Sequence, residues 1–156
     1  MTLATMAHAS IPLVWAAACG CFDLWRRRLP NALTLGAAVL GLVWLIGTGA
    51  GLLGGTAASC LGAAVLALVL TVPAYARGQL GAGDVKLLAA IGLLAGLEAL
   101  LVTYMVAGLL AGGGLWLNHQ LGRYRLDHPG ARGRWLPFGF LLTIGFSVAI
   151  LFPEIM

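Results

Sequence analysis

The sequence predicts an all-α, polytopic membrane protein with about six transmembrane helices. Hydrophobic residues make up 61% of the 156 positions and charged residues only 9%, whereas about a quarter of an ordinary soluble domain is charged. The mean hydropathy is +0.99. This composition excludes disordered, collagen-like and disulfide-rich secreted proteins. No stretch is long enough for a separate aqueous domain, so residues 1–156 are expected to form a single integral-membrane domain.

The charged residues divide the chain into stretches that match membrane spans, which need about 20 apolar residues each. The uncharged stretch 29–76 is long enough for two crossings, and its glycine-rich middle, 47–55, is the natural turn. The apolar stretch 87–97 is too short alone, so the fourth helix must begin near Gly83. The expected helices are 9–22, 31–46, 56–75, 83–97, 99–122 and 135–152.

The basic residues predict how these helices are oriented. All nine fall at the same set of helix ends, in the loops after the first, third and fifth helices or, for Lys86, in the first turn of the helix that follows. They are Arg26, Arg27, Arg28, Arg77, Lys86, Arg123, Arg125, Arg132 and Arg134. Basic loops face the cytoplasm, so both termini are expected on the opposite side. The net charge of +4 therefore reflects topology, and no nucleic-acid partner is expected.

Two of the five acidic residues are expected at the same depth on the cytoplasmic side. Asp23 ends the first helix, and Asp84 opens the fourth in the segment Gly81-Ala-Gly-Asp84-Val-Lys86. Carboxylates at membrane depth are costly and are by default functional. The other acids lie at helix ends or in a basic loop, where solvation suffices: Glu98, Asp127 and Glu154.

The two aspartates have two interpretations. Carboxylates that share a site cannot both ionise, so a dyad holds one proton and can activate water while polarising a peptide carbonyl. Alternatively, Asp23 pairs with Arg26 or Arg27 one turn later, and Asp84 is an acid favoured by the dipole at a helix N-terminus. The spacing leaves both interpretations open.

Residues around Asp84 are candidates for a substrate site. Gly81 and Gly83 would let the backbone approach an extended substrate closely. Lys86 lies two positions after Asp84 and on a regular helix points away from it. It is a further candidate for the substrate site; alternatively, it faces Asp23 or extends to lipid phosphate.

Three segments together resemble the type IV prepilin peptidases, a family of GxGD intramembrane aspartyl proteases. The first is Asp23 followed by basic residues and Leu29-Pro30-Asn31. The second is Gly81-Ala-Gly-Asp84-Val-Lys86, which is similar to the family's GxGDxK motif. The third is Leu136-Pro137-Phe138-Gly139, which opens the last helix. Their order and spread cover nearly the whole chain.

The resemblance implies an aspartic endopeptidase that cleaves short, basic leader peptides from prepilins or pseudopilins, with Asp23 and Asp84 as the catalytic pair. It implies a location in the bacterial inner membrane, an active site facing the cytoplasm, and a role in type IV pilus assembly and secretion. Membrane lipid is the other expected partner. The oligomeric state is not determined by these motifs.

The cysteines suggest a short form of the family. Larger members carry an N-terminal cytoplasmic insertion with paired Cys-x-x-Cys motifs and methylate the new pilin N-terminus. Cys19, Cys21 and Cys60 form no such pair, so the chain resembles the short form of tight-adherence (Flp) pilus systems. No methyltransferase activity, metal or cofactor is expected.

A second function stays open on the residues alone. A small ion-coupled transporter would use Asp23 and Asp84 as coupling acids, although transport sites tend to lie nearer the membrane midplane. Leader cleavage would establish the peptidase, whereas flux in proteoliposomes would favour the transporter.

Overall fold

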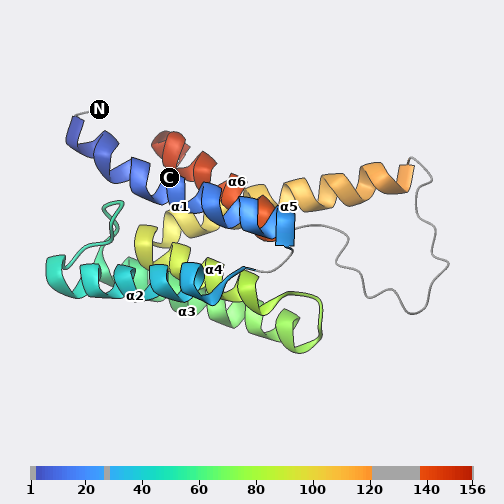
Figure 1. The fold of residues 1–156 in the computed structure, drawn as a ribbon, viewed down its shortest axis with the longest axis horizontal. Helices are drawn as coiled ribbons and strands as arrows, with labels where there is room; N and C mark the ends of the chain where they lie inside the picture. Colours follow the sequence, from blue (N-terminus) through green and yellow to red (C-terminus); the bar gives the residue numbers. More distant parts are fainter. Residues whose placement is uncertain (1–2, 27–28, 121–137, 156) are drawn as a thin grey trace.

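The computed structural model describes residues 3–26, 29–120 and 138–155, and within them the chain folds into six α-helices and a final 3-10 turn (Figure 1). The elements are α1 (Leu3–Arg26), α2 (Asn31–Thr48), α3 (Ala57–Ala76), α4 (Ala82–Ala95), α5 (Leu97–Gln120), α6 (Phe138–Leu151) and η1 (Pro153–Ile155). The predicted all-α fold and its six helices are confirmed. Helix α4 begins at Ala82, as the shortness of its apolar stretch required.

The helices differ in whether they can cross a bilayer alone. Within the described residues, α2, α3 and the part of α5 from Leu97 to Leu117 are long and apolar enough to do so, and α6 is a shorter apolar helix. Helices α4 and α6 have 14 residues each, or about 21 Å, against a hydrocarbon core of about 30 Å. The C-terminal end of α4 is fixed at the α2–α3 loop, because the Leu53 N–H donates to the Leu94 carbonyl at 3.2 Å.

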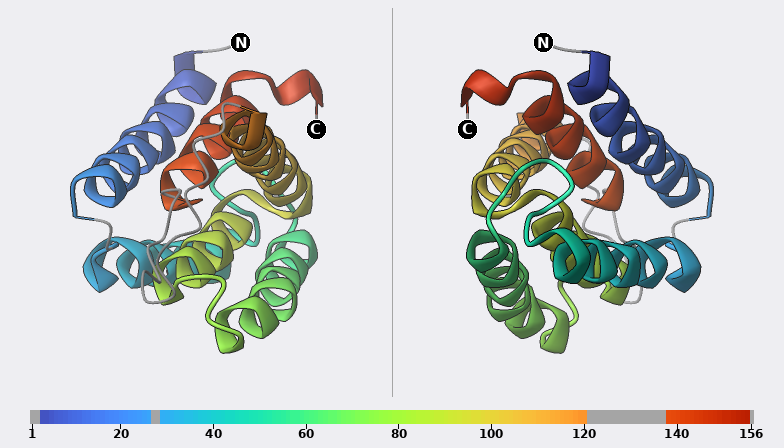
Figure 2. Two further views of the ribbon diagram at one scale, coloured as in Figure 1. Left: turned by 90° about the vertical axis from the view of Figure 1, so that its right-hand side faces the viewer. Right: turned by 90° about the vertical axis from the view of Figure 1, so that its left-hand side faces the viewer.

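Helix α4 is the centre of the bundle. It packs against α2 and α3 on one side and against α5 and α6 on the other, while α1 lies along α6 (Figure 2). Most of α4 is consequently buried, although its apolar residues show no amphipathic stripe. A helix that is apolar all round is expected in the middle of a membrane bundle. Figure 1 shows that the C-terminal part of α5 extends beyond the ends of the other helices.

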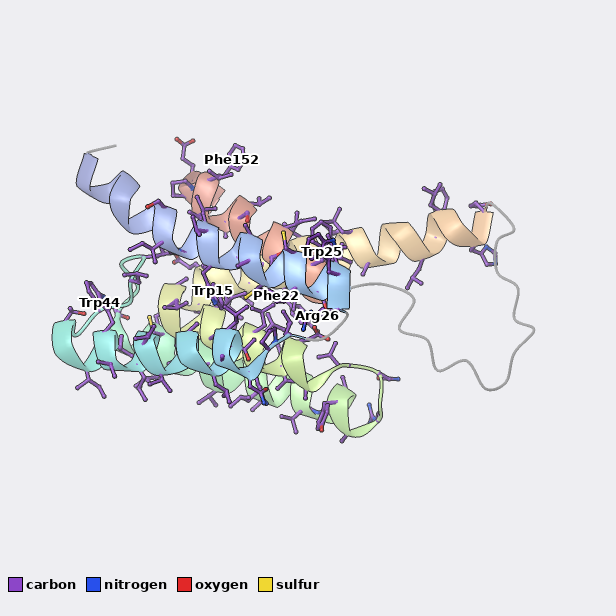
Figure 3. All side chains as sticks on the ribbon, in the orientation of Figure 1. Trp15, Phe22, Trp25, Arg26, Trp44 and Phe152 are labelled. Atoms are coloured by element: carbon purple, nitrogen blue, oxygen red, sulfur yellow. The ribbon has the colours of Figure 1, made fainter. Side chains whose placement is uncertain are left out.

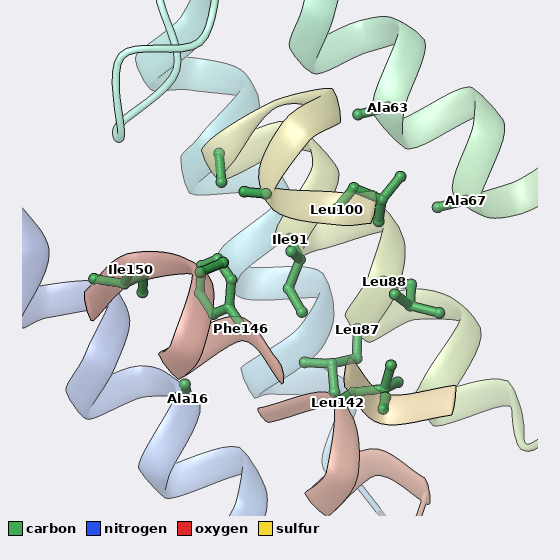
Figure 4. Packing of buried hydrophobic residues seen from close by; sticks show 14 of the residues in the cluster. Ala16, Ala63, Ala67, Leu87, Leu88, Ile91, Leu100, Leu142, Phe146 and Ile150 are labelled. Carbon is green, nitrogen blue, oxygen red and sulfur yellow. The ribbon is translucent and has the colours of Figure 1, made fainter. Parts of the chain in front are cut away.

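The core joins α4 to α6. Leu87, Ile91, Leu142 and Phe146 are fully buried and lie together (Figure 4). Phe146 also receives the edge of Trp15 from α1, with ring centroids 6.1 Å apart. Large apolar side chains on the outer faces, chiefly of α2, α3 and α5, point outward instead (Figure 3). This distribution suits a bundle whose surroundings are lipid.

Small residues let α3 and α4 approach closely. A β-carbon added to Gly92 would lie 2.9 Å from the Ala63 carbonyl carbon and 2.9 Å from the Ala64 nitrogen, both backbone atoms of α3. Gly112 on α5 is different, since a β-carbon there would meet nothing within 4 Å. Because packing drives helix association in lipid, the two glycines should respond differently to substitution.

We predict that Gly92→Ala lowers the free energy of unfolding by about 1–3 kcal/mol, the usual cost of overpacking a core. Gly112→Ala is the matched control and should be neutral or stabilising by up to about 1 kcal/mol, because alanine is the better helix former. Unfolding of both variants in detergent, followed by circular dichroism, makes the comparison. Equal stability of the two variants would contradict the close α3–α4 contact.

Candidate active site

Asp23 lies in the last turn of α1 and faces α6. Its side chain is only 5% exposed, and its Oδ2 accepts a hydrogen bond of 2.9 Å from the backbone N–H of Phe140. Phe140 is the third residue of α6, where backbone N–H groups have no acceptor within the helix. Asp23 therefore caps α6 from another part of the chain. Arg26, its expected partner in the structural interpretation, is exposed, and Arg27 lies outside the described residues.

Asp84 lies in the first turn of α4 and is 3% exposed. Its Oδ2 accepts a hydrogen bond of 3.1 Å from the backbone N–H of Gly81, the N-cap residue of the same helix. The positive end of the helix dipole favours a carboxylate here. The helix N-terminal contact expected for Asp84 is therefore present, and it is made by Oδ2.

The two carboxylates meet at Gly139, the second residue of α6. A β-carbon added to Gly139 would lie 2.8 Å from Asp23 Oδ2 and 3.1 Å from Asp84 Oδ1. The two oxygens are therefore no further apart than the sum of these distances, about 6 Å. The structure thus brings together the two aspartates that the sequence placed at one depth, and any side chain at position 139 would intrude on both.

The glycines before Asp84 serve the start of α4. Gly81 is the N-cap in an extended conformation. Gly83 is helical, and a β-carbon added there would lie 3.0 Å from the β-carbon of Leu29. The structure thus gives Gly83 a packing role against the segment that precedes α2. Contact of Gly81 or Gly83 with a substrate stays a prediction.

Lys86 faces α2. Its Nζ donates a hydrogen bond of 2.8 Å to Asn31 Oδ1, and Asn31 is the first residue of α2. Asn31 is a partner that none of the expected roles of Lys86 named. A role of Lys86 in substrate binding stays a prediction.

Three residues at the site were not among the predicted site residues. Asn31 and Gly139 stood in the motif segments, and only the tertiary contacts reveal what they touch. Phe140 acts through its backbone N–H, for which no side-chain pattern gives a signal. Leu136 and Pro137 of the third motif lie outside the described residues.

This arrangement suits acid–base chemistry between carboxylates. Each acid accepts a hydrogen bond from a backbone N–H at the start of a helix, and Asp23 Oδ2 and Asp84 Oδ1 both lie close to the position that a β-carbon of residue 139 would occupy. Such a pair can hold one proton between two sites. Within the described ranges, no three His, Cys, Asp or Glu residues lie together as a metal ion would require.

A comparison with protein families decides the assignment. Residues 10–121 match the type IV leader peptidase family, which is well over half of the chain. The chain belongs to the type IV leader peptidase family. The matched stretch contains Asp23, Leu29-Pro30-Asn31 and the Gly81–Lys86 motif, and it ends before Gly139. Comparisons with curated proteins and with solved structures found no match.

Membership makes this protein a leader peptidase of the membrane, which confirms the resemblance noted in the sequence. Prepilin-type leader peptides are the substrates that the family implies. The motifs that carry Asp23 and Asp84 both lie inside the matched stretch.

We predict that Gly139→Ala lowers leader-peptide cleavage by about 100-fold or more, because a 1 Å displacement of reacting groups can cost that much. The added methyl group would occupy the space between the two carboxylates. Gly62→Ala is the control, since a β-carbon there meets nothing within 4 Å. Both variants should insert and unfold as the unchanged protein does; full cleavage by Gly139→Ala would contradict the geometry.

Proposed function

We propose that this leader peptidase is an aspartic endopeptidase in which Asp23 and Asp84 share one proton and activate water. The observation that carries the proposal is the pair of buried carboxylate oxygens on either side of Gly139, within about 6 Å of each other. A water molecule placed between two such groups can be hydrogen-bonded by both.

The reaction follows from this pair. The ionised carboxylate takes a proton from water as the water oxygen attacks the scissile carbonyl carbon, while the protonated carboxylate donates its proton towards the carbonyl oxygen. The tetrahedral intermediate then collapses. The C–N bond breaks, the departing nitrogen takes the proton that came from water, and the carbonyl oxygen returns its proton to the pair. The two aspartates end as they began, with one proton between them.

The helix N-termini would keep the two carboxylates correctly oriented during these proton transfers. Phe140 N–H orients Asp23 and Gly81 N–H orients Asp84, and the dipoles of α6 and α4 offset part of the cost of a charge at this depth. The proton can therefore move between the facing oxygens while the hydrogen bonds to the helices persist.

The substrates we propose are prepilins or pseudopilins of the Flp type, cleaved at the cytoplasmic face of a bacterial inner membrane. Arg26, Arg77 and Lys86 all lie near the helix ends at which α2 and α4 begin, as expected for the cytoplasmic side. The first residues of α1 and the last residues of the described chain lie towards the opposite end (Figure 1), which supports placing both termini outside.

The transporter alternative receives less support. The chain belongs to a peptidase family, and its two aspartates lie at the end of α1 and the beginning of α4. Coupling acids of transporters tend to lie near the midplane.

We predict that Asp23→Asn and Asp84→Asn each abolish cleavage of a prepilin that carries a short basic leader. Each change nearly preserves shape but removes a group that must give or take a proton. Because the two act as a unit, the double variant should be no less active than either single variant. Leader removal is read as a mass shift of the purified substrate.

Glu98→Gln is the control for these variants, because Glu98 is exposed in the first turn of α5, away from the pair. It should cleave normally. Robust cleavage by either asparagine variant, at matched expression, would exclude the aspartic mechanism, and ion flux without cleavage would favour the transporter.

We predict that the α3–α4 turn faces the cytoplasm and the C-terminal end faces outward. Single cysteines at Gln79 and Glu154, introduced after Cys19, Cys21 and Cys60 are replaced by alanine, test this orientation. An impermeant thiol reagent added to intact cells should modify position 154 and reach position 79 only after permeabilisation. The reverse pattern would refute the topology.

A further inference from the structure

We propose that Leu29 and Asn31 form a clamp on the first turn of α4, in which the Asn31–Lys86 hydrogen bond positions Asp84 relative to Asp23. Lys86 is then a positioning residue and does not itself bind the substrate. This inference rests on the proposed aspartic mechanism, and one of its tests below needs no activity.

The first contact of the clamp is polar. Lys86 is the only lysine of the chain, and its Nζ donates to Asn31 Oδ1 at 2.8 Å. A cation is disfavoured near a helix N-terminus, yet Lys86 lies in the second turn of α4 and contacts the first residue of α2. Helix electrostatics therefore do not explain a lysine at this position, whereas a specific hydrogen bond to Asn31 does.

The second contact is apolar and lies at Gly83, the residue before Asp84. Leu29 is partly buried and packs against the main core. A β-carbon added to Gly83 would lie 3.0 Å from the β-carbon of Leu29 and 3.3 Å from its Cδ1. Gly83 thus lets the α4 backbone rest directly on the Leu29 side chain, which limits movement of the first turn.

The two contacts are made by residues of α4 that precede and follow Asp84 in the sequence. Gly83 and Lys86 stand on either side of it, and their partners Leu29 and Asn31 belong to one short segment. That segment begins only a few residues after Asp23, at the end of α1. The segment that holds Asp84 therefore follows closely on the helix that carries Asp23, and in this proposal the clamp sets the distance between the two carboxylates.

Positioning and substrate binding by Lys86 predict different kinetics. If Lys86 acts through Asn31, loss of either partner should lower kcat by about 10- to 100-fold and leave KM unchanged, because the carboxylates are misplaced before the substrate arrives. If Lys86 binds the substrate directly, Lys86→Met should raise KM and Asn31→Leu should have little effect.

The test is a double-mutant cycle on the full-length protein in detergent, with a purified prepilin that has a short basic leader. Lys86→Met keeps the apolar stem and removes the donor, and Asn31→Leu removes the acceptor at similar volume. The double variant should lose no more kcat than either single variant, because both remove one contact. Lys86→Arg, which retains a donor, and the exchanged pair Lys86→Asn with Asn31→Lys should recover most of kcat.

Arg77→Met is the matched control, since it removes a positive charge from an exposed position in the α3–α4 turn. It should leave kcat and KM unchanged. Independent losses in Lys86→Met and Asn31→Leu that multiply in the double variant would overturn the proposal, as would a change confined to KM.

A crosslinking measurement separates this proposal from the proposed function. Cysteines at positions 23 and 84, in a background with Cys19, Cys21 and Cys60 replaced by alanine, report proximity with a short bifunctional thiol reagent. Crosslinking should be slower when Lys86→Met or Asn31→Leu is added, and it should be unaffected by Arg77→Met. Equal rates in all backgrounds would overturn the clamp, even if the parent protein that retains Asp23 and Asp84 cleaves prepilin. Slower rates, together with a parent protein that cleaves no prepilin, would retain the clamp and reject the peptidase mechanism.

Discussion

The burial of two carboxylates in an apolar helical bundle is the constraint on which the rest of the structure depends. Removing an ionised carboxylate from water costs several kcal/mol even after relaxation, and Asp23 and Asp84 are almost completely buried. Each receives a backbone N–H from the first turn of a helix, Asp23 from α6 and Asp84 from α4. Those N–H groups would otherwise lack acceptors, so one arrangement satisfies both the acids and the helix ends.

The short helices make this arrangement possible. Helices α4 and α6 have 14 described residues each, and the first described turn of each lies near the end of α1, where Asp23 lies. If α4 and α6 extended further at their N-terminal ends, their first N–H groups would lie further from the end of α1. The position of α4 in the centre of the bundle then places Asp84 beside the start of α6, and Gly139 provides the space in which the two acids face each other.

The segment between α1 and α2 links this site to the rest of the bundle. Leu29 packs on Gly83 and Asn31 binds Lys86, while Trp15 of α1 donates to the Leu33 carbonyl in α2 at 3.0 Å. These contacts hold α1, α2 and α4 together near the aspartates. Elsewhere an open apolar groove of about 260 Å³ runs between α1 and α2, lined by residues such as Pro12, Gly36 and Leu40.

The sequence alone determined the helices, the membrane class and the family. These depend on local properties: uncharged stretches of spanning length, basic residues in alternate loops, and motifs of adjacent residues such as those around Asp23 and Asp84. It also placed these two acids at one depth, because topology follows from charge and helix length. None of these inferences required knowledge of which helices touch.

Only the tertiary structure decided what each motif residue contacts. That Phe140 N–H donates to Asp23, that Gly139 lies beside both acids and that Lys86 binds Asn31 depend on how α1, α2 and α6 pack around α4. Backbone N–H groups and α-carbons have the same chemistry at every position, so no residue pattern marks the ones that a distant carboxylate approaches. The distance between the aspartates is likewise set by packing between helices that are remote in the chain.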